Sequence, residues 1–513
     1  MTDSLLAALV FVPLLGVLFC IPLSQQLTKW VGLVISLVGV GLAALLYQRF
    51  DSANSAQLQM GWAVPWVSQY GIKFSLAVDG VSFPLVLLTK FMMPIAILAS
   101  WGEDRRLRAF ISCFLLLDFA MTGTFLSTDI FLFYVFWELM LIPMILLIGV
   151  WGSQNRVYAA LKFFLFTFAG SVLMLVAILW MFSEYHTQFG VYTSEISQLA
   201  KLRLSLVPIL WGLSVQDFIF WGLTLAFLIK VPMFPLHTWL PDAHVQAPTG
   251  GSVLLAAVLL KMGTYGLMRF SIPFAPEAFL KGIPLLSTLS LVGIVYGAWV
   301  AFQQTDMKKL VAYSSVSHLG FVVLGLCTLN REGLTGSVLQ VINHGVSSGA
   351  LFLLVGILYE RRHSRQFEDF GGLASVMPRY AFFLVFVACS SMAVPGLNGF
   401  VGEFLILLGA FKAKPMWAYI AVTAAVFGAL YLLVMIRQVL FGPVTSGENK
   451  NLKDITVRDW ASLIPITIMI LVLGVRPNVL LRKIDPALDN FWKASLEKKS
   501  SNVSVLGKRD KRV

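Results

Sequence analysis

The chain has 513 residues, of which 58% are hydrophobic and only 12% charged, and its mean hydropathy is +0.82. This composition excludes an ordinary soluble globular protein and is typical of a polytopic membrane protein. The formal net charge of +12 does not indicate nucleic-acid binding, because Lys and Arg gather in short loops at 103–108, 306–309 and 360–365, as the positive-inside rule expects.

Apolar runs and the turn residues between them predict about 14 membrane-spanning helices in one all-α domain. The predicted spans lie near 4–22, 30–48, 82–101, 109–127, 129–151, 158–183, 213–232, 248–270, 282–303, 308–328, 333–359, 379–411, 416–441 and 457–475. The N-terminal segment 1–20 carries Asp3 and lacks a basic region and a small-residue cleavage site, so we expect a retained helix rather than a signal peptide. Two longer loops are predicted at 49–80 and 184–212, and the basic tail is expected to be partly disordered.

Loop charges favour an outward N-terminus, with about 15 Lys and Arg in the inward loops and about 9 in the outward ones. The C-terminal tail contradicts this orientation, because it carries about 10 more basic residues and would face outward.

Two of the predicted helices are interrupted by helix-breaking residues. Pro232 and Pro235 follow Lys230, and Pro395 and Gly396 precede Glu403. The interrupted helices occupy matching places in two five-helix blocks, which indicates an inverted-repeat transporter with a site at each break. Ordinary proline kinks are the alternative interpretation. The resulting segments are 1–108 with three N-terminal helices, 109–271 with the first repeat, 272–445 with the second, and 446–513 with the last helix and tail.

Ionisable residues stand inside several apolar runs. Glu138 lies inside its segment, Lys230 ends its run, and Lys261 and Glu403 are central in theirs. A charge at mid-bilayer depth costs at least roughly 2.5–3.5 kcal/mol and usually marks an ion or proton path. Opening and closing a Glu138–Lys230 pair would change proton affinity by several kcal/mol, because one pKa unit is worth about 1.4 kcal/mol. A static buried ion pair is the alternative.

Further polar residues extend this candidate path. His318 and His344 lie on separate predicted helices and are candidate proton relays, although a hydrogen-bonded structural role is the alternative for each. Candidate modulators or gates are Lys162, His237, Asp242, His244 and Asp118. Lys162 could instead extend towards the membrane interface, and the three residues after the first break could instead cap the broken helix.

The sequence predicts no metal or cofactor site in this chain. Its four cysteines are scattered without ligand spacing, and no Gly-rich phosphate loop is present. No acidic pair shares a helix at close spacing, so protons are favoured over sodium, which prefers several hard oxygen ligands.

Five segments carry a resemblance to a known family. They are 136–144 (FWELMLIPM), 226–271 (beginning AFLIKVPMFPLHTWLPDAH), 303–321 (QQTDMKKLVAYSSVSHLGF), 342–361 (INHGVSSGALFLLVGILYER) and 399–407 (GFVGEFLIL). Together they resemble the antiporter-like membrane subunits of bacterial respiratory complex I, the proton-pumping NADH:quinone oxidoreductase. A glutamate as the distal acid is similar to the M type (chain 4 type) among them.

The resemblance implies 14 helices, two inverted five-helix repeats and one proton route. The implied pumping glutamate is Glu138, the broken-helix lysine Lys230, the central lysine Lys261 and the distal acid Glu403, with His318 and His344 as relays. Asp118 and the basic tail depart from the family pattern.

The resemblance also implies partners and a location. NADH, FMN, iron–sulfur clusters and quinone are expected in partner subunits, and the neighbours are expected to be L-type and N-type antiporter-like subunits, the lateral helix of the L-type subunit, and lipids. The expected location is a bacterial inner membrane, or alternatively a cyanobacterial thylakoid membrane with ferredoxin as electron donor. A subunit of a multisubunit cation/proton antiporter or membrane-bound hydrogenase, and a membrane scaffold, remain alternative functions.

Overall fold

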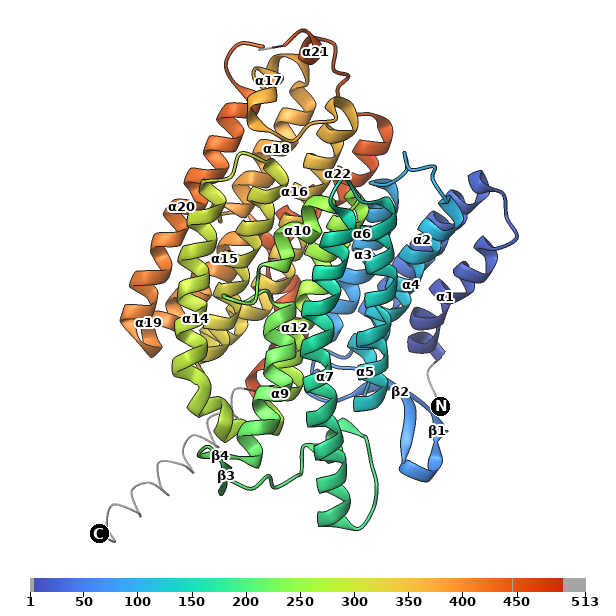
Figure 1. Cartoon of the computed structure of the whole chain (residues 1–513), viewed down its shortest axis with the longest axis vertical. Coiled ribbons are helices and arrows are strands. Elements are labelled where there is room, and N and C mark those ends of the chain that lie inside the picture. The colour runs from blue at the N-terminus through green and yellow to red at the C-terminus, as the bar shows by residue number, and fades with distance from the viewer. Residues whose placement is uncertain (1–3, 445, 492–513) are drawn as a thin grey trace.

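The structure, a computed structural model, describes residues 4–444 and 446–491. Within these ranges, ten helices are long and apolar enough to cross a membrane, and three shorter apolar helices accompany them. The predicted all-α polytopic fold is therefore confirmed (Figure 1). The count of 14 helices, the inverted repeats and the segment boundaries stay predictions.

The helices and strands follow one another along the chain in a single series. They are α1 (Ser4–Cys20), α2 (Gln25–Arg49), β1 (Gln59–Val67), η1 (Ser68–Tyr70), β2 (Ile72–Val78), α3 (Phe83–Leu98), α4 (Leu107–Leu126), α5 (Ile130–Leu139), α6 (Leu141–Trp151), α7 (Arg156–Phe189), α8 (Ile196–Leu199), β3 (Pro208–Leu210), β4 (Leu213–Ser214), α9 (Val215–Lys230), α10 (Trp239–Gln246), α11 (Thr249–Leu254), η2 (Leu255–Leu259), α12 (Leu260–Gly266), η3 (Leu267–Ser271), α13 (Ile272–Phe274), α14 (Pro276–Phe302), α15 (Met307–Cys327), α16 (Arg331–Arg362), η4 (Phe367–Asp369), α17 (Leu373–Val376), α18 (Pro378–Ser391), α19 (Asn398–Ala413), α20 (Pro415–Leu440), α21 (Gly447–Lys450) and α22 (Val457–Val475). A further helical stretch covers 478–491.

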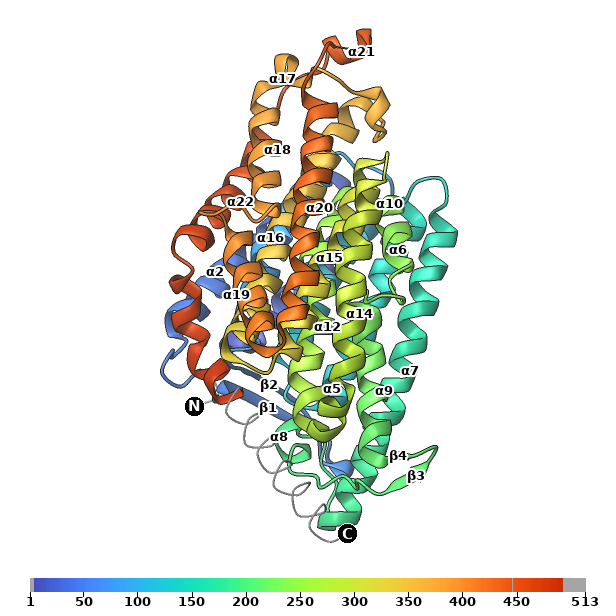
Figure 2. The ribbon, with the colours of Figure 1, turned by 90° about the vertical axis from the view of Figure 1, so that its left-hand side faces the viewer.

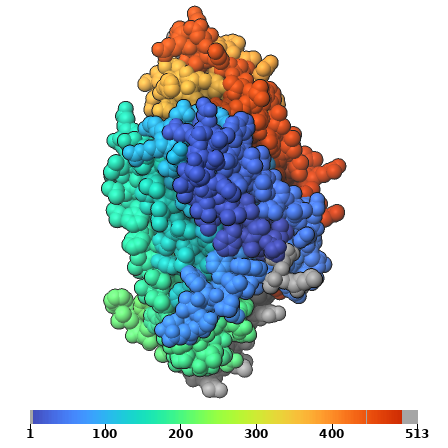
Figure 3. Space-filling view, turned by 90° about the vertical axis from the view of Figure 1, so that its right-hand side faces the viewer, coloured from blue at the N-terminus to red at the C-terminus, as the bar shows by residue number. Residues whose placement is uncertain are grey.

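The long helices run roughly along one axis and form a bundle (Figures 1 and 2). The segment from α11 to α13, together with α15 and α16, is almost wholly buried, whereas α2, α7, α20 and α22 expose most of their surface. Figure 3 shows the N-terminal helices and the hairpin below them covering one side of the molecule. A charge on one of the buried helices is surrounded by protein and therefore needs protein partners.

Both predicted helix interruptions are present. The first separates α9, which a Ser214–Asp217 capping box starts and Lys230 ends, from α10. Because proline cannot donate to the helix ladder, Pro232 and Pro235 keep the backbone irregular between them. The second interruption separates α18 from α19, and Gly396 adopts a φ of +91° there, which favours glycine.

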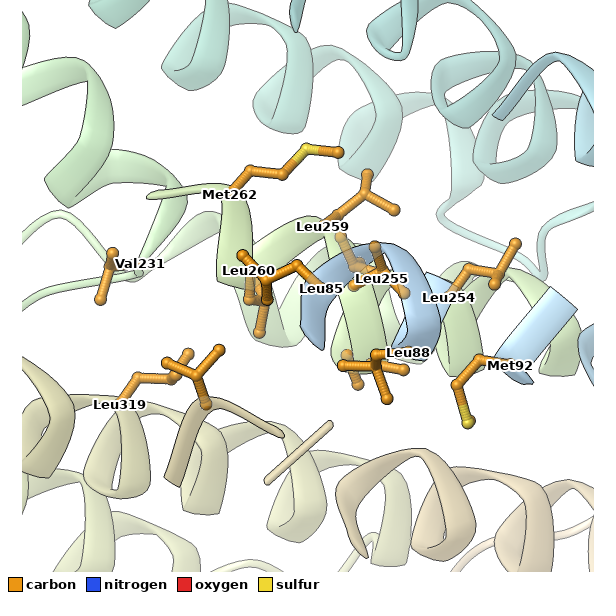
Figure 4. Packing of buried hydrophobic residues seen from close by; sticks show 14 of the residues in the cluster. Leu85, Leu88, Met92, Val231, Leu254, Leu255, Leu259, Leu260, Met262 and Leu319 are labelled. Atoms are coloured by element: carbon orange, nitrogen blue, oxygen red, sulfur yellow. The ribbon is translucent and has the colours of Figure 1, made fainter. Parts of the chain in front are cut away.

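The span containing Lys261 departs from a plain helix. Wider π-helical turns, η2 and η3, stand on either side of α12, an irregularity that often accompanies functional sites. At Gly263 an added Cβ would lie 2.5 Å from the Phe227 carbonyl oxygen, so only glycine allows α12 to approach α9 this closely. Figure 4 shows Leu255 and Leu259 of η2 packed near Leu85 and Leu88 of α3. Lys261 therefore lies in a densely apolar part of the protein.

Three loop predictions are corrected. Within the predicted loop 49–80, β1 and β2 form an antiparallel hairpin, with Gly71 in the left-handed conformation at the turn. In the predicted loop 184–212, α7 continues to Phe189 and the short strand β3 pairs with β4 just beyond the loop. Part of the C-terminal tail, residues 478–491, is helical. Lys483 in this stretch donates hydrogen bonds to the carbonyl oxygens of Tyr47 and Phe50. The rest of the tail, 492–513, lies outside the described residues.

Candidate functional site

Lys261 contacts one of the predicted relay histidines directly. Its Nζ lies 2.6 Å from Nδ1 of His344 on α16 and donates to the Ala256 carbonyl oxygen within η2. Lys261 is fully buried and His344 is 4% exposed. Because an ammonium can only donate, His344 accepts through Nδ1 when Lys261 is charged. The contact therefore allows a proton to pass between the two side chains.

The second relay histidine contacts the distal acid. Nδ1 of His318 on α15 lies 2.7 Å from Oε1 of Glu403 on α19. The same oxygen accepts a hydrogen bond of 2.9 Å from Nε2 of Gln340, and the Tyr431 hydroxyl lies 3.4 Å from Nε2 of His318. Glu403 is thus a buried acid whose Oε1 contacts both His318 and Gln340.

The two contacts form one line of polar side chains. The rings of His318 and His344 are 5.6 Å apart between centroids, a separation that one water molecule or a ring rotation can bridge. The line runs from Lys261 through the two histidines to Glu403, so the structure brings four of the sequence-predicted residues together. Each comes from a different helix segment, α12, α16, α15 and α19.

Next to this line, the second break is held by neutral polar groups. Asn398 at the start of α19 accepts from Ser390 at 2.5 Å and donates to the Asn343 carbonyl oxygen, and Asn343 donates in turn to the Asn398 carbonyl oxygen at 2.6 Å. Reciprocal bonds of this kind compensate for the backbone groups that the interruption leaves without helical partners.

Glu138 and Lys230 lie near each other at the first break but do not form the close pair that the sequence suggested. Lys230 is 1% exposed, and its Nζ has no hydrogen-bond partner among the described residues. It lies 5.0 Å from the Trp137 ring centroid and 5.7 Å from that of Phe163, within the range of cation–π attraction. Its interaction with Glu138 is electrostatic, without an ion-pair contact within 4.0 Å in the part of the chain that the structure describes.

The carboxylate of Glu138 is similarly underbonded. Its Oε1 is buried and makes no hydrogen bond within the described residues. Tyr134, one helical turn earlier on α5, interacts with both Glu138 and Ser171 of α7. The first break therefore lies beside one buried base, Lys230, and a partly buried acid, Glu138, each of which has a buried polar atom without a hydrogen-bond partner among the described residues, a condition that favours a change of protonation or partner.

Lys162 pairs with Asp242 rather than with Glu138. Its Nζ donates to Oδ2 of Asp242 on α10 at 2.7 Å, and both side chains are partly exposed. His237, in the break, is buried beside this pair. Of the modulators proposed from sequence, these three residues lie together.

His244 connects the buried line to a polar cavity. It is fully buried, stacks on Phe352 with centroids 4.2 Å apart, and interacts electrostatically with Lys308 and Lys261. Lys308 lines a cavity of about 510 Å³ together with Glu103, Arg105, Glu360, His363 and Arg365. This cavity is a polar recess on the Lys308 side of His244.

Asp118 forms a buried ion pair away from both breaks. Its Oδ1 accepts from Lys90 Nζ at 2.7 Å and from Thr122 at 3.2 Å, and Lys90 also donates to the Leu9 carbonyl oxygen. Both charged side chains are essentially unexposed. The pair links α1, α3 and α4, and the hydrogen bonds of Asp118 are with Lys90 and Thr122.

Removing one partner of this pair is expected to destabilise the protein strongly. Asp118→Leu would leave a buried ammonium with only one carbonyl partner, a loss of roughly 3–5 kcal/mol. The double variant Lys90→Met/Asp118→Leu is expected to recover most of that loss, because no unpaired charge remains. Thermal unfolding of the purified complex measures both. Equal destabilisation by the single and double variants would contradict this account.

Some residues of the site were missed by the sequence reasoning. They are Gln340, Tyr431, Tyr134, Trp137 and the group Asn343, Ser390 and Asn398. Gln340 lies one turn before His344 on the same helix and could have been found from its i, i+4 spacing. The others carry no sequence signal apart from a polar or aromatic atom within an apolar run.

The geometry agrees with comparisons to known proteins. A family model described as NADH:quinone oxidoreductase/Mrp antiporter, TM, matches residues 127–428. The chain belongs to this family. It is 42% identical to NADH-quinone oxidoreductase subunit M of Rhodobacter capsulatus, over 91% of each chain. It is 39% identical to NADH-ubiquinone oxidoreductase chain 4 of Arabidopsis thaliana, over 95% of this chain and 96% of the relative.

Solved structures give the same family. A chain of respiratory complex I from Thermus thermophilus with bound NADH superposes with a TM-score of 0.86 at 31% identity, covering 95% of this chain and 99% of that one. A chain of the Mrp complex from Dietzia shares the fold at 24% identity, with a TM-score of 0.78 and 96% and 51% coverage. The family resemblance predicted from the five motifs is therefore confirmed.

Proposed function

We propose that this chain is a proton-translocating membrane-arm subunit of a quinone oxidoreductase that takes electrons from NADH or a related donor. The observation that carries the proposal is the line of four buried ionisable side chains from Lys261 through His344 and His318 to Glu403. Buried ionisable residues are costly in a membrane, and a connected line of them supports a proton path better than a static framework does. Identity to subunit M relatives over most of the chain supports the reaction.

The line moves a proton by successive transfers between named atoms. Lys261 Nζ gives a proton to His344 Nδ1, which it already contacts. His344 passes a proton to His318 across the ring separation, through water or by rotation. His318 Nδ1 delivers it to Glu403 Oε1, and Gln340 keeps that oxygen in place.

Glu138 and Lys230, the acid and base at the first break, supply the driving force for proton transfer. When Glu138 is charged, it favours a charged Lys230, and when it is neutral, Lys230 loses that support. Such a change alters proton affinity by about 1.4 kcal/mol per pKa unit. Moving one charge across about 100 mV needs about 2.3 kcal/mol. A swing of about two pKa units at this pair is therefore sufficient to move a proton against the membrane potential.

The redox chemistry belongs to other subunits in this proposal. The four cysteines are isolated from one another, so iron–sulfur clusters, together with NADH, FMN and quinone, are assigned to partner chains. L-type and N-type antiporter-like subunits and the lateral helix of the L-type subunit are the proposed neighbours. The chain itself acts as a non-redox translocating subunit in a bacterial inner membrane.

Replacing the distal acid tests the proposal. Glu403→Gln keeps the shape and the contact with Gln340 but cannot receive the proton from His318. Proton pumping in vesicles, measured with quinone reduction by the assembled complex, is expected to fall about tenfold or more.

Glu368→Gln provides the control, because Glu368 is an exposed carboxylate in η4, away from the line. It is expected to pump like the wild type. Undiminished pumping by an assembled Glu403→Gln complex would overturn the proposed route.

A further inference from the structure

An ion pair stands beside an underbonded histidine at the first break. Lys162 of α7 and Asp242 of α10 are 2.7 Å apart, with side chains 21% and 39% exposed. His237 is 3% exposed, its Nδ1 has no hydrogen-bond partner among the described residues, and it interacts electrostatically with Lys162. A buried imidazole without a fixed partner at this atom is able to gain or lose a proton there.

Besides Lys162 of α7 and Asp242 of α10, residues of α14 and α15 also lie close to His237. The ring of His237 lies 5.2 Å from that of Tyr296 on α14 and 6.4 Å from that of Tyr313 on α15. Tyr313 interacts electrostatically with Tyr296, Asp242 and Lys162. The groups facing His237 are therefore Lys162, Asp242 and the two tyrosines, and α15 also carries His318. A change of charge at His237 is therefore felt at α15, the helix that also carries His318 of the buried line.

The negative charge of Asp242 compensates the positive charge of Lys162 beside His237. A lone ammonium beside His237 would disfavour the imidazolium, and a lone carboxylate would favour it. With both present and in contact, the carboxylate of Asp242 opposes part of the effect that the ammonium of Lys162 exerts on its neighbour. Screening is incomplete because the histidine is buried while the pair is only partly exposed.

We propose that Asp242 is a positioning residue which compensates Lys162, so that His237 exchanges a proton at the first break. This inference rests on the proposed proton translocation and adds His237 as the group that the pair controls. A structural alternative exists for Asp242, because an acidic residue in the first turn of α10 also suits the helix dipole. That alternative predicts no particular relation between Asp242 and Lys162 variants.

The test compares three variants of the assembled complex in vesicles by the pH profile of coupled proton pumping. Asp242→Asn leaves Lys162 uncompensated and is expected to move the limb of the profile to lower pH by about half a unit. Lys162→Met leaves Asp242 uncompensated and is expected to move it to higher pH by a similar amount. The double variant Lys162→Met/Asp242→Asn is expected to return close to the wild-type profile.

A fourth measurement tests whether the shifts of the pH profile arise from His237. In a His237→Gln background, which retains polar atoms but does not titrate, both single-variant shifts are expected to disappear. Shifts in the same direction, or a double variant farther from wild type than either single variant, would overturn the inference.

The two proposals fail in different ways. Glu403→Gln with undiminished pumping would remove the proposed function. Reduced pumping by Glu403→Gln with unchanged pH profiles in the Lys162 and Asp242 variants would remove only the role of the pair.

Discussion

Replacing Glu138 with Gln is expected to reduce coupled proton pumping to less than about one-tenth of the wild-type rate, with quinone reduction falling in parallel. The amide has nearly the same volume as the carboxylate, so the packing of α5 should remain. Without a titratable carboxylate, however, no change of charge at this position alters the electrostatic stabilisation of the charged Lys230. Pumping by the assembled complex in vesicles, together with quinone reduction, measures the effect.

Glu138→Asp serves as the matched control, since it keeps the titratable group on a shorter side chain. It is expected to retain a substantial part of the activity. If Glu138→Gln pumped as well as wild type, the proposed driving role of Glu138 and Lys230 would be wrong. The proton would then have to enter the path at another residue.

Replacing Lys261 with Met is expected to have an effect of similar size. The methionine fits among the leucines of α12 and η2, so the fold should survive, but His344 loses the group that hands it a proton. Pumping is expected to fall about tenfold or more, measured in the same vesicles.

Two further variants separate charge from proton exchange. Lys261→Arg keeps the positive charge but does not release a proton at physiological pH, and is expected to fail like Lys261→Met. Lys201→Met, at an exposed position, is expected to behave as wild type. An active Lys261→Arg complex would show that charge alone is sufficient at this position, which contradicts the transfer from Lys261 to His344.

The burial of the ionisable residues could be predicted from sequence because each interrupts an apolar run. Their partners could not. Lys261 and His344 are 83 residues apart, and His318 and Glu403 are 85 apart, so only the packing of α12, α15, α16 and α19 decides which meet. No local pattern encodes such long-range pairing.

The full surroundings of Lys230 at the first break could not be predicted from sequence. Sequence reasoning paired Glu138 with Lys230 by opposite charge and gave no weight to Trp137, although it is adjacent to Glu138. In the structure an aromatic face takes part of the role assigned to the carboxylate. The hairpin at 59–78 was missed for a different reason, since a search for apolar runs does not register a short, largely exposed pair of strands.

Atoms such as Lys230 Nζ and Glu138 Oε1, which are buried without hydrogen bonds to the described residues, have a cost for the molecule as a whole. Replacing a buried charge pair by well-packed apolar side chains is often neutral or stabilising. A chain selected only for thermal robustness would therefore lose these residues. Their presence marks a trade-off in which folding stability is given up so that the charges remain able to change state.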